Sequence, residues 1–252
     1  MNARRPRRVM GAAIATIVAV TALCGLGTWQ IERKAWKEAL IDTLTRRLSA
    51  PPASLPPRPT WPTLDPAQDE FRRISFSAEF LTDREAFVYT AGSALRNDIS
   101  GPGYWVFTPS RLAGGSVIVI NRGFIPQDRK AESSASSGLV DVVGVLRWPE
   151  KRNVFTPKDD PAHNLWFARD PESMAAEKGW GPVAPFYIEL ESPVPASGLP
   201  RPGMLTVNLP NNHLSYAITW FGLAAALAVI FLIWAFAELR KPRIPPVSGA
   251  SL

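Results

Sequence analysis

Two long runs of uncharged residues, one near each end of the chain, limit its fold more than any other feature. Val9 to Thr28 contains twenty residues without a charge, and Leu214 to Ala237 contains twenty-four. An α-helix rises about 1.5 Å per residue, so each run can cross a hydrocarbon core about 30 Å thick. We therefore expect transmembrane helices over residues 9–28 and 213–237. A cleaved signal peptide is the alternative for the first run, which follows a basic start.

The charge distribution indicates how these helices are oriented. Residues 9–237 hold 21 basic and 21 acidic side chains, so the net charge of +6 comes from the two tails, 1–8 and 238–252. A nucleic-acid-binding protein would carry its basic excess on a folded face, so we expect no nucleic-acid partner. Lys and Arg next to a span favour the cytoplasmic side, which predicts that both termini are cytoplasmic and that residues 29–212 lie on the other side. The basic residues in question are Arg4, Arg5, Arg7, Arg8, Arg240, Lys241 and Arg243.

Sequence patterns divide the region between the spans into three parts. Apolar residues at helical spacing from Trp29 to Leu48 predict that the first helix continues beyond the membrane. Residues 49–66 contain seven prolines, which predicts an extended linker. A β-rich domain follows. Small residues at four-residue spacing in both spans would also let the two helices approach closely, namely Gly11, Ala15 and Ala19, Gly222 and Ala226, and Ala224 and Ala228.

Short runs of β-branched and aromatic residues predict the strands of this domain. Gly114-Gly115 predicts the turn of a hairpin over 104–121, Gln127–Gly138 an exposed loop, and Asp170-Pro171 the start of a helix to about Lys178. The fold class is therefore an α+β membrane protein, in which two transmembrane helices bracket a mainly antiparallel-β extracytoplasmic domain that could close partly into a barrel. The predicted strands are Ile74–Phe80, Ala86–Thr90, Tyr104–Thr108, Ser116–Asn121, Leu139–Arg147, Phe186–Leu190 and Leu205–Leu209.

Few side chains are suited to catalysis. Cys24 is the single cysteine, which excludes an intrachain disulfide and a two-cysteine metal site. The two histidines, His163 and His213, are too few for a zinc hydrolase or a haem-modifying enzyme. No serine lies in a G-x-S-x-G motif, and Gly101-Pro102-Gly103 lacks the lysine and helix of a phosphate-binding loop. We therefore expect a protein that is not an enzyme.

His213 is the strongest candidate for a ligand-binding residue. It opens the second span after a helix-start signal, so we expect it at the outer membrane interface. Tyr216 and Trp220 follow at helical spacing on the same side, which suits a flat apolar ring with a metal centre, and a neutral imidazole is a common iron ligand. The alternative is an interfacial histidine that only hydrogen-bonds to lipid headgroups or to an asparagine.

Arg122 is the second candidate. The apolar run before Asn121-Arg122-Gly123 predicts a strand that ends there, beside a glycine that allows a bend. At a strand end, Arg122 could hold a carboxylate such as a propionate through two hydrogen bonds. The alternative is an ion pair with a carboxylate of the domain itself.

Five segments, in order along the chain, together resemble the surfeit locus protein 1 family. The most specific segments are the first, which reads G-x-W-Q-x-x-R-x-x-W-K, and the last, which contains Asn-Asn-His-Leu-Ser-Tyr-Ala. One departure is Phe124, where the family usually carries Trp. The segments are Gly27–Lys37, Gly103–Pro109, Ile118–Pro126, Pro185–Ile188 and Asn211–Ala224.

The resemblance implies a non-enzymatic factor in cytochrome c oxidase assembly. It implies that the protein holds or delivers haem a, transiently bound, with His213 as the axial ligand of the iron. The implied partners are the catalytic subunit of cytochrome c oxidase, haem a synthase and the lipid bilayer. The rival interpretation is a membrane scaffold that binds an oxidase subunit without haem. The short segment before the first span favours a bacterial inner membrane, with the central domain in the periplasm.

Overall fold

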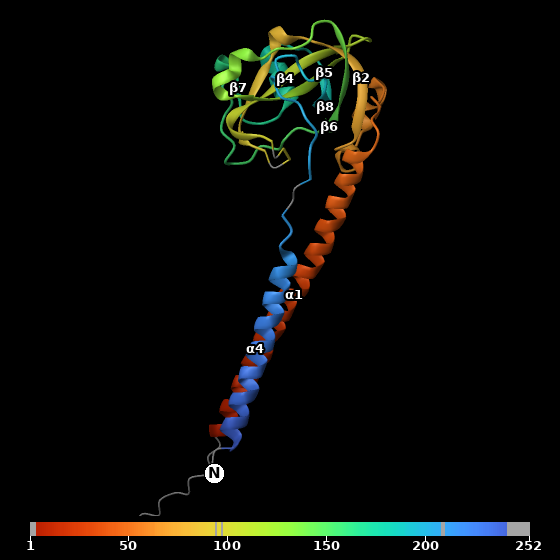
Figure 1. The fold of residues 1–252 in the computed structure, drawn as a ribbon. Helices are drawn as coiled ribbons and strands as arrows, with labels where there is room; N and C mark the ends of the chain where they lie inside the picture. Colours follow the sequence, from red (N-terminus) through yellow and green to blue (C-terminus); the bar gives the residue numbers. More distant parts are fainter. Residues whose placement is uncertain (1–3, 94, 97, 208–209, 241–252) are drawn as a thin grey trace, which may run out of the picture. The chain divides into compact units, whose positions relative to one another are not determined.

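The computed structural model describes residues 4–93, 95–96, 98–207 and 210–240. The chain forms two compact units: Met1–Leu40 together with Pro210–Leu252, and Ile41–Leu209. The first unit is helical and the second is β-rich, so the fold confirms two long apolar helices flanking a β domain (Figure 1). The expected domain boundaries at residues 28 and 213 stay predictions.

Helix α1 spans Arg4–Ser49 and helix α4 spans His213–Arg240. Within the described residues, these two helices are long and apolar enough to cross a membrane. The continuation of the first helix to residue 48 is confirmed. The basic residues 4–8, expected as a tail, are already helical. Lys241, Arg243 and the rest of the expected C-terminal tail lie outside the described residues.

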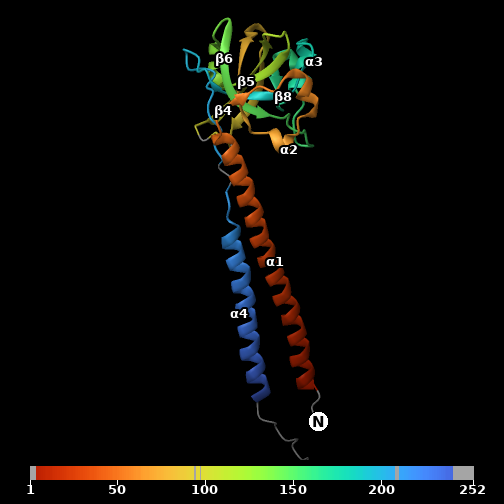
Figure 2. The ribbon, with the colours of Figure 1, turned by 90° about the vertical axis from the view of Figure 1, so that its right-hand side faces the viewer.

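In the helical unit, α1 and α4 run side by side in opposite directions (Figure 2). A Cβ on Gly27 would lie 2.7 Å from the ring of Phe221, and the Lys37 ammonium donates to the carbonyl of Pro210. The later residue of α1, Lys37, thus contacts the earlier residue, Pro210, just before α4, which shows that the two helices are antiparallel. The expected close approach at Gly11 and Gly222 is wrong, because an added Cβ at either would meet nothing within 4 Å.

The β-rich unit contains a closed barrel. The sheet order is β1-β2-β6-β8-β5-β4-β3-β7, and a further pairing of β2 with β4 closes a ring of five strands, β2-β6-β8-β5-β4. The ring is closed, whereas the sequence predicted only partial closure. The strands are β1 (Ala53–Ser54), β2 (Arg73–Phe80), β3 (Ala86–Gly92), β4 (Ser100–Leu112), β5 (Val117–Pro126), β6 (Leu139–Arg147), β7 (Leu165–Trp166) and β8 (Val183–Ser192).

The pairings confirm a mainly antiparallel sheet with the predicted β4–β5 hairpin, although β5 and β8 pair in parallel. The Gly115 amide donates to the carbonyl of Leu112 in the hairpin turn, at 2.8 Å. The expected strand over Leu205–Leu209 is wrong for residues 205–207, which form no strand, while 208 and 209 lie outside the described residues. Leu205 instead packs on Leu48 and Val145, so its burial explains the apolar pattern.

The proline-rich segment is packed against the barrel and is not a simple linker. It contains β1, the 3₁₀ helix η1 (Arg58–Thr63) and the start of the short helix α2 (Pro66–Asp69). Trp61 of η1 is buried edge-to-face against Phe186 of β8, with ring centroids 5.4 Å apart. The prolines therefore stiffen a segment whose tryptophan closes one side of the core.

Two further elements complete the domain. Helix α3 (Pro171–Lys178) is confirmed, with the Asp170 carboxylate accepting from the Ser173 amide at its N-terminus. The expected exposed loop 127–138 is wrong in part. It forms the 3₁₀ helix η3 (Gln127–Glu132), after which Ser133 Oγ accepts from the buried Arg122 and Ser134 Oγ donates to the carbonyl of Leu199. The remaining 3₁₀ helices are η2 (Thr82–Arg84) and η4 (Pro161–His163).

Candidate functional site

His213 is the first residue of α4, as expected. The Tyr216 amide donates to the Asn212 carbonyl at 3.3 Å, which forms the first turn of the helix. The segment before this turn is held to α1 by the bond from Lys37 to the carbonyl of Pro210. The imidazole therefore starts a helix whose beginning is fixed against a second helix.

The His213 ring contacts a buried polar side chain of α1. Its Nδ1 lies 2.7 Å from Oε1 of Gln30, and only 9% of Gln30 is exposed. Among the described residues, none forms a hydrogen bond with Nε2 of His213. One ring nitrogen thus contacts Gln30, and the other has no hydrogen-bond partner in the described part of the chain.

The residues that follow His213 at helical spacing differ in exposure. Tyr216 is 56% exposed, Trp220 is half-buried, and Ala217 is 1% exposed. Leu214, Ile218 and Phe221 also leave large apolar surfaces uncovered. The imidazole is therefore bordered by exposed apolar and aromatic surface, which suits a flat apolar ligand.

Among the described residues, His213 is not part of a cluster of metal-ligating side chains. The described part of the chain contains no group of three or more His, Cys, Asp or Glu side chains arranged to hold a metal ion. A single imidazole provides one axial bond and cannot enclose a bare ion. The donor set therefore fits a metal whose other ligands are supplied by a porphyrin.

Arg122 belongs to the barrel and not to a strand end. The prediction that its strand ends there is wrong, because β5 continues to Pro126 through a β-bulge in which Arg122 and Gly123 lie opposite Val106. Only 2% of Arg122 is exposed. Its guanidinium pairs with the Glu85 carboxylate and donates to Thr108 Oγ1 at 2.8 Å and to Ser133 Oγ at 3.1 Å.

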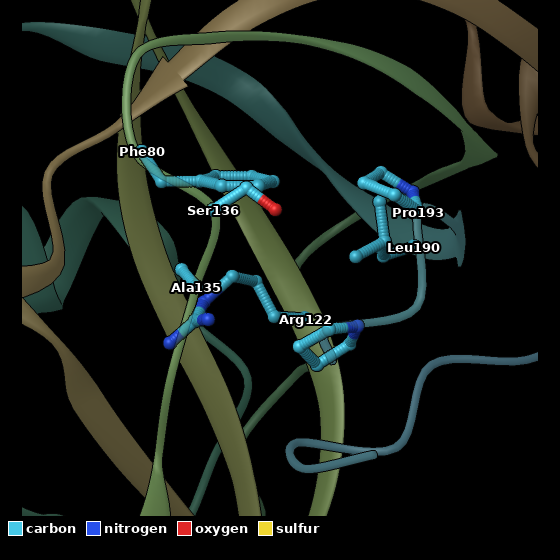
Figure 3. A pocket seen from close by; sticks show the side chains of 7 residues that line it. Phe80, Arg122, Ala135, Ser136, Leu190 and Pro193 are labelled. Atoms are coloured by element: carbon cyan, nitrogen blue, oxygen red, sulfur yellow. The ribbon is translucent and has the colours of Figure 1, made fainter. Parts of the chain in front are cut away.

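The ion pair between Arg122 and Glu85 confirms the alternative that this arginine binds a carboxylate of its own domain. Burial raises the pKa of Glu85 despite the opposing charge of Arg122 and hydrogen bonds from Ser133, Arg122 and Thr108. The cavity beside Arg122 measures about 10 Å³, close to the smallest space that holds one water (Figure 3). A ligand-binding role for Arg122 stays a prediction, and its guanidinium is already occupied.

A second buried polar cluster gave no signal in the sequence. Asn121 Nδ2 donates to Glu189 Oε1 at 3.0 Å across the β5–β8 pair, and Arg169 lies 3.8 Å from the other oxygen of Glu189. Complete burial raises the pKa of the adjacent Tyr187 phenol. Gln30 was missed in the same way, although it stands one helical turn after Gly27 in the first of the five segments.

The fold and this site define a class of protein in which two apolar helices carry an imidazole that contacts a glutamine through Nδ1, and in which the same chain forms a closed five-stranded barrel. The SURF1 family model matches residues 17–225, and the chain belongs to that family.

Individual relatives cover most of the chain. It is similar to the SURF1-like protein of Monosiga brevicollis, with 36% identity over 224 residues that cover 84% of this chain and 82% of the relative. It is 32% identical to Surfeit locus protein 1 of Rattus norvegicus over 221 residues, covering 82% and 70%. The Homo sapiens protein of the same name is also 32% identical, over 230 residues, covering 85% and 74%.

Proposed function

We propose that this protein is a membrane-anchored, non-enzymatic factor in cytochrome c oxidase biogenesis that holds or delivers haem a. The observation that carries the proposal is the imidazole of His213 at the start of an apolar helix, with Nδ1 in contact with Gln30 and Nε2 without a partner among the residues that the structure describes. Membership of the SURF1 family supports the same role. In this proposal, haem a is cargo that passes to the catalytic subunit of the oxidase, and haem a synthase is the partner that supplies it.

The proposed topology follows from charge and helix direction. Because α1 and α4 are antiparallel, their basic outer ends lie on the same side of a bilayer. That side would be cytoplasmic, and His213 would lie near the opposite interface. In a bacterial inner membrane, the barrel domain would then be periplasmic.

Two features of the helical unit suit haem a. His213 Nε2 would hold the haem through its iron. The exposed Tyr216 and the half-buried Trp220 would provide aromatic surface for the porphyrin. Haem a also has a long apolar tail, so it could reach these helices from within a bilayer. One axial bond from the chain gives a reversible hold, which suits transfer better than storage.

The test is an optical spectrum of the full chain purified from cells that make haem a. His213→Ala should remove the Soret band of haem a, because the axial nitrogen is lost. His163→Ala is a matched control, since His163 is the other histidine and its side chain is 80% exposed on η4. An unchanged band in His213→Ala would remove this residue from the site. A chain that promotes oxidase assembly but never carries haem a would support the scaffold interpretation instead.

A further inference from the structure

The side chain of Gln30 determines which nitrogen of His213 is available. A neutral imidazole carries one proton, and an amide carbonyl can only accept a hydrogen bond. With Gln30 Oε1 2.7 Å from Nδ1, a neutral ring that donates this hydrogen bond carries its proton on Nδ1 and its lone pair on Nε2. We propose that Gln30 is a positioning residue that holds His213 in this tautomer and orients Nε2 toward the ligand. The inference rests on the proposed function of His213 as an iron ligand.

Packing around the pair keeps Gln30 within reach. One turn before Gln30, Gly27 lets α4 approach so closely that a Cβ would meet the Phe221 ring at 2.7 Å. One turn after His213, Ala217 is 1% exposed. Two turns after Gln30, Lys37 holds the carbonyl of Pro210. The two helices are thus in contact on both sides of the hydrogen bond, which limits the rotation of both side chains.

The chemistry of Gln30 differs from that of a carboxylate in the same place. Metal-binding histidines usually donate their second N–H to a carboxylate, a carbonyl or water, which fixes the tautomer and raises the basicity of the ligand nitrogen. A neutral amide gives orientation with a weaker increase in basicity than a carboxylate. A glutamine therefore fits a factor that must release its cargo, and a glutamate at this position would hold the iron more tightly.

The first experiment observes the tautomer without haem. The full chain, labelled with ¹⁵N-histidine and reconstituted in nanodiscs, contains two histidines, and His163→Gln identifies the signals of His213. We expect a protonated Nδ1 and an unprotonated Nε2 at His213. Gln30→Leu should lose this preference, and Gln30→Glu should retain it. A ring protonated on Nε2 in the wild-type chain would overturn the inference, because the amide would then be donating to Nδ1.

The second experiment uses ferric haem b added to the haem-free chain. Loss of a partner of this kind typically weakens binding about 10- to 100-fold, and we expect that loss for Gln30→Leu. Gln30→Glu should bind ferric haem more tightly than the wild-type chain and lower the reduction potential of the bound haem, which a purely structural role would not do. Equal affinity in Gln30→Leu and wild type would overturn the role of Gln30. A wild-type chain that binds no haem, with the expected tautomer present, would instead contradict the proposed function.

Discussion

The helical unit and the barrel domain use buried polar groups in different ways. In the barrel, Arg122 is bonded to Glu85, Thr108 and Ser133, and Arg96 is bonded to Asp98 and to the carbonyl of Pro202. In the helical unit, Nδ1 of His213 contacts Gln30, and Nε2 has no hydrogen-bond partner within the described ranges. These two arginines are therefore bonded within their own domain, although other buried atoms there, such as Trp105 Nε1 and Trp166 Nε1, have no partner among the described residues. His213 differs because its ring opens an apolar helix with exposed apolar surface, which is the basis of the proposed ligand site. Substitutions should separate the two: barrel variants should change stability, and variants of the helix pair should change haem binding.

The largest stability loss in the barrel is expected at the β-bulge. Gly123 has φ +115°, and a Cβ there would lie 2.1 Å from the carbonyl oxygen of Arg201. Gly123→Ala should cost roughly 4 kcal/mol, because it combines backbone strain with a clash against main chain. Gly198→Ala is the control, since Gly198 has φ +74° but open space around it, and should cost about 1 kcal/mol. Denaturant unfolding of the full chain in detergent, followed by tryptophan fluorescence, measures both. Equal losses would mean that the approach of Arg201 is unimportant.

The next effect concerns the buried ion pair. Arg122→Met should cost about 3 kcal/mol, because it leaves the Glu85 carboxylate buried without its cation. The double variant Arg122→Met/Glu85→Leu should recover much of that loss, since a buried pair can be replaced by apolar side chains of similar volume. Unfolding free energies of the two variants decide this.

The same variants also test the division between the units. The haem a Soret band should be unchanged in the folded Arg122→Met chain. Loss of the band without loss of stability would break the comparison, and would restore Arg122 as a residue that holds a carboxylate of the cargo.

Local signals in the sequence predicted the local parts of the fold. The long helices follow from uncharged runs, α3 from the Asp170-Pro171 start, and the β4–β5 hairpin from Gly114-Gly115. Features that depend on distant residues were not predictable. The packing of Trp61 on Phe186 joins segments 125 positions apart. The parallel pairing of β5 with β8 is not indicated by the sequence of either strand.

The candidate site shows the same limit. His213 could be identified because its position at a helix start is a local property. Its partner Gln30 is 183 positions away, and only the antiparallel contact of the two helices brings the side chains together. Arg122 was placed at a strand end because Gly123 was taken as a terminus. A bulge and a strand end share the same local residues, and the difference lies in the pairing of residues 124–126 with β4.

The smallest effect we expect is a pH dependence of stability. It tests whether burial of the Glu85 carboxyl group outweighs its attraction to Arg122. Burial raises the pKa of Glu85 above its usual value of 4.5, so the folded chain holds this proton more tightly than the unfolded chain. The stability from this group is full below pH 4.5 and is lost as the pH rises through the raised pKa. Wild type should therefore lose stability relative to Glu85→Gln between pH 4.5 and neutral pH, as measured by denaturant unfolding.

Glu132→Gln provides the control for this measurement. The guanidinium of Arg129 lowers the pKa of Glu132, which is exposed on η3, so any stability from this carboxylate is lost only as the pH falls below its usual range. The difference between wild type and Glu132→Gln should be flat from pH 4.5 upward. If the difference for Glu85→Gln instead grew in favour of wild type as the pH rose, attraction to Arg122 would outweigh the cost of burial. The barrel would then gain stability from the pair, and its buried charges could no longer be explained as groups that merely compensate one another.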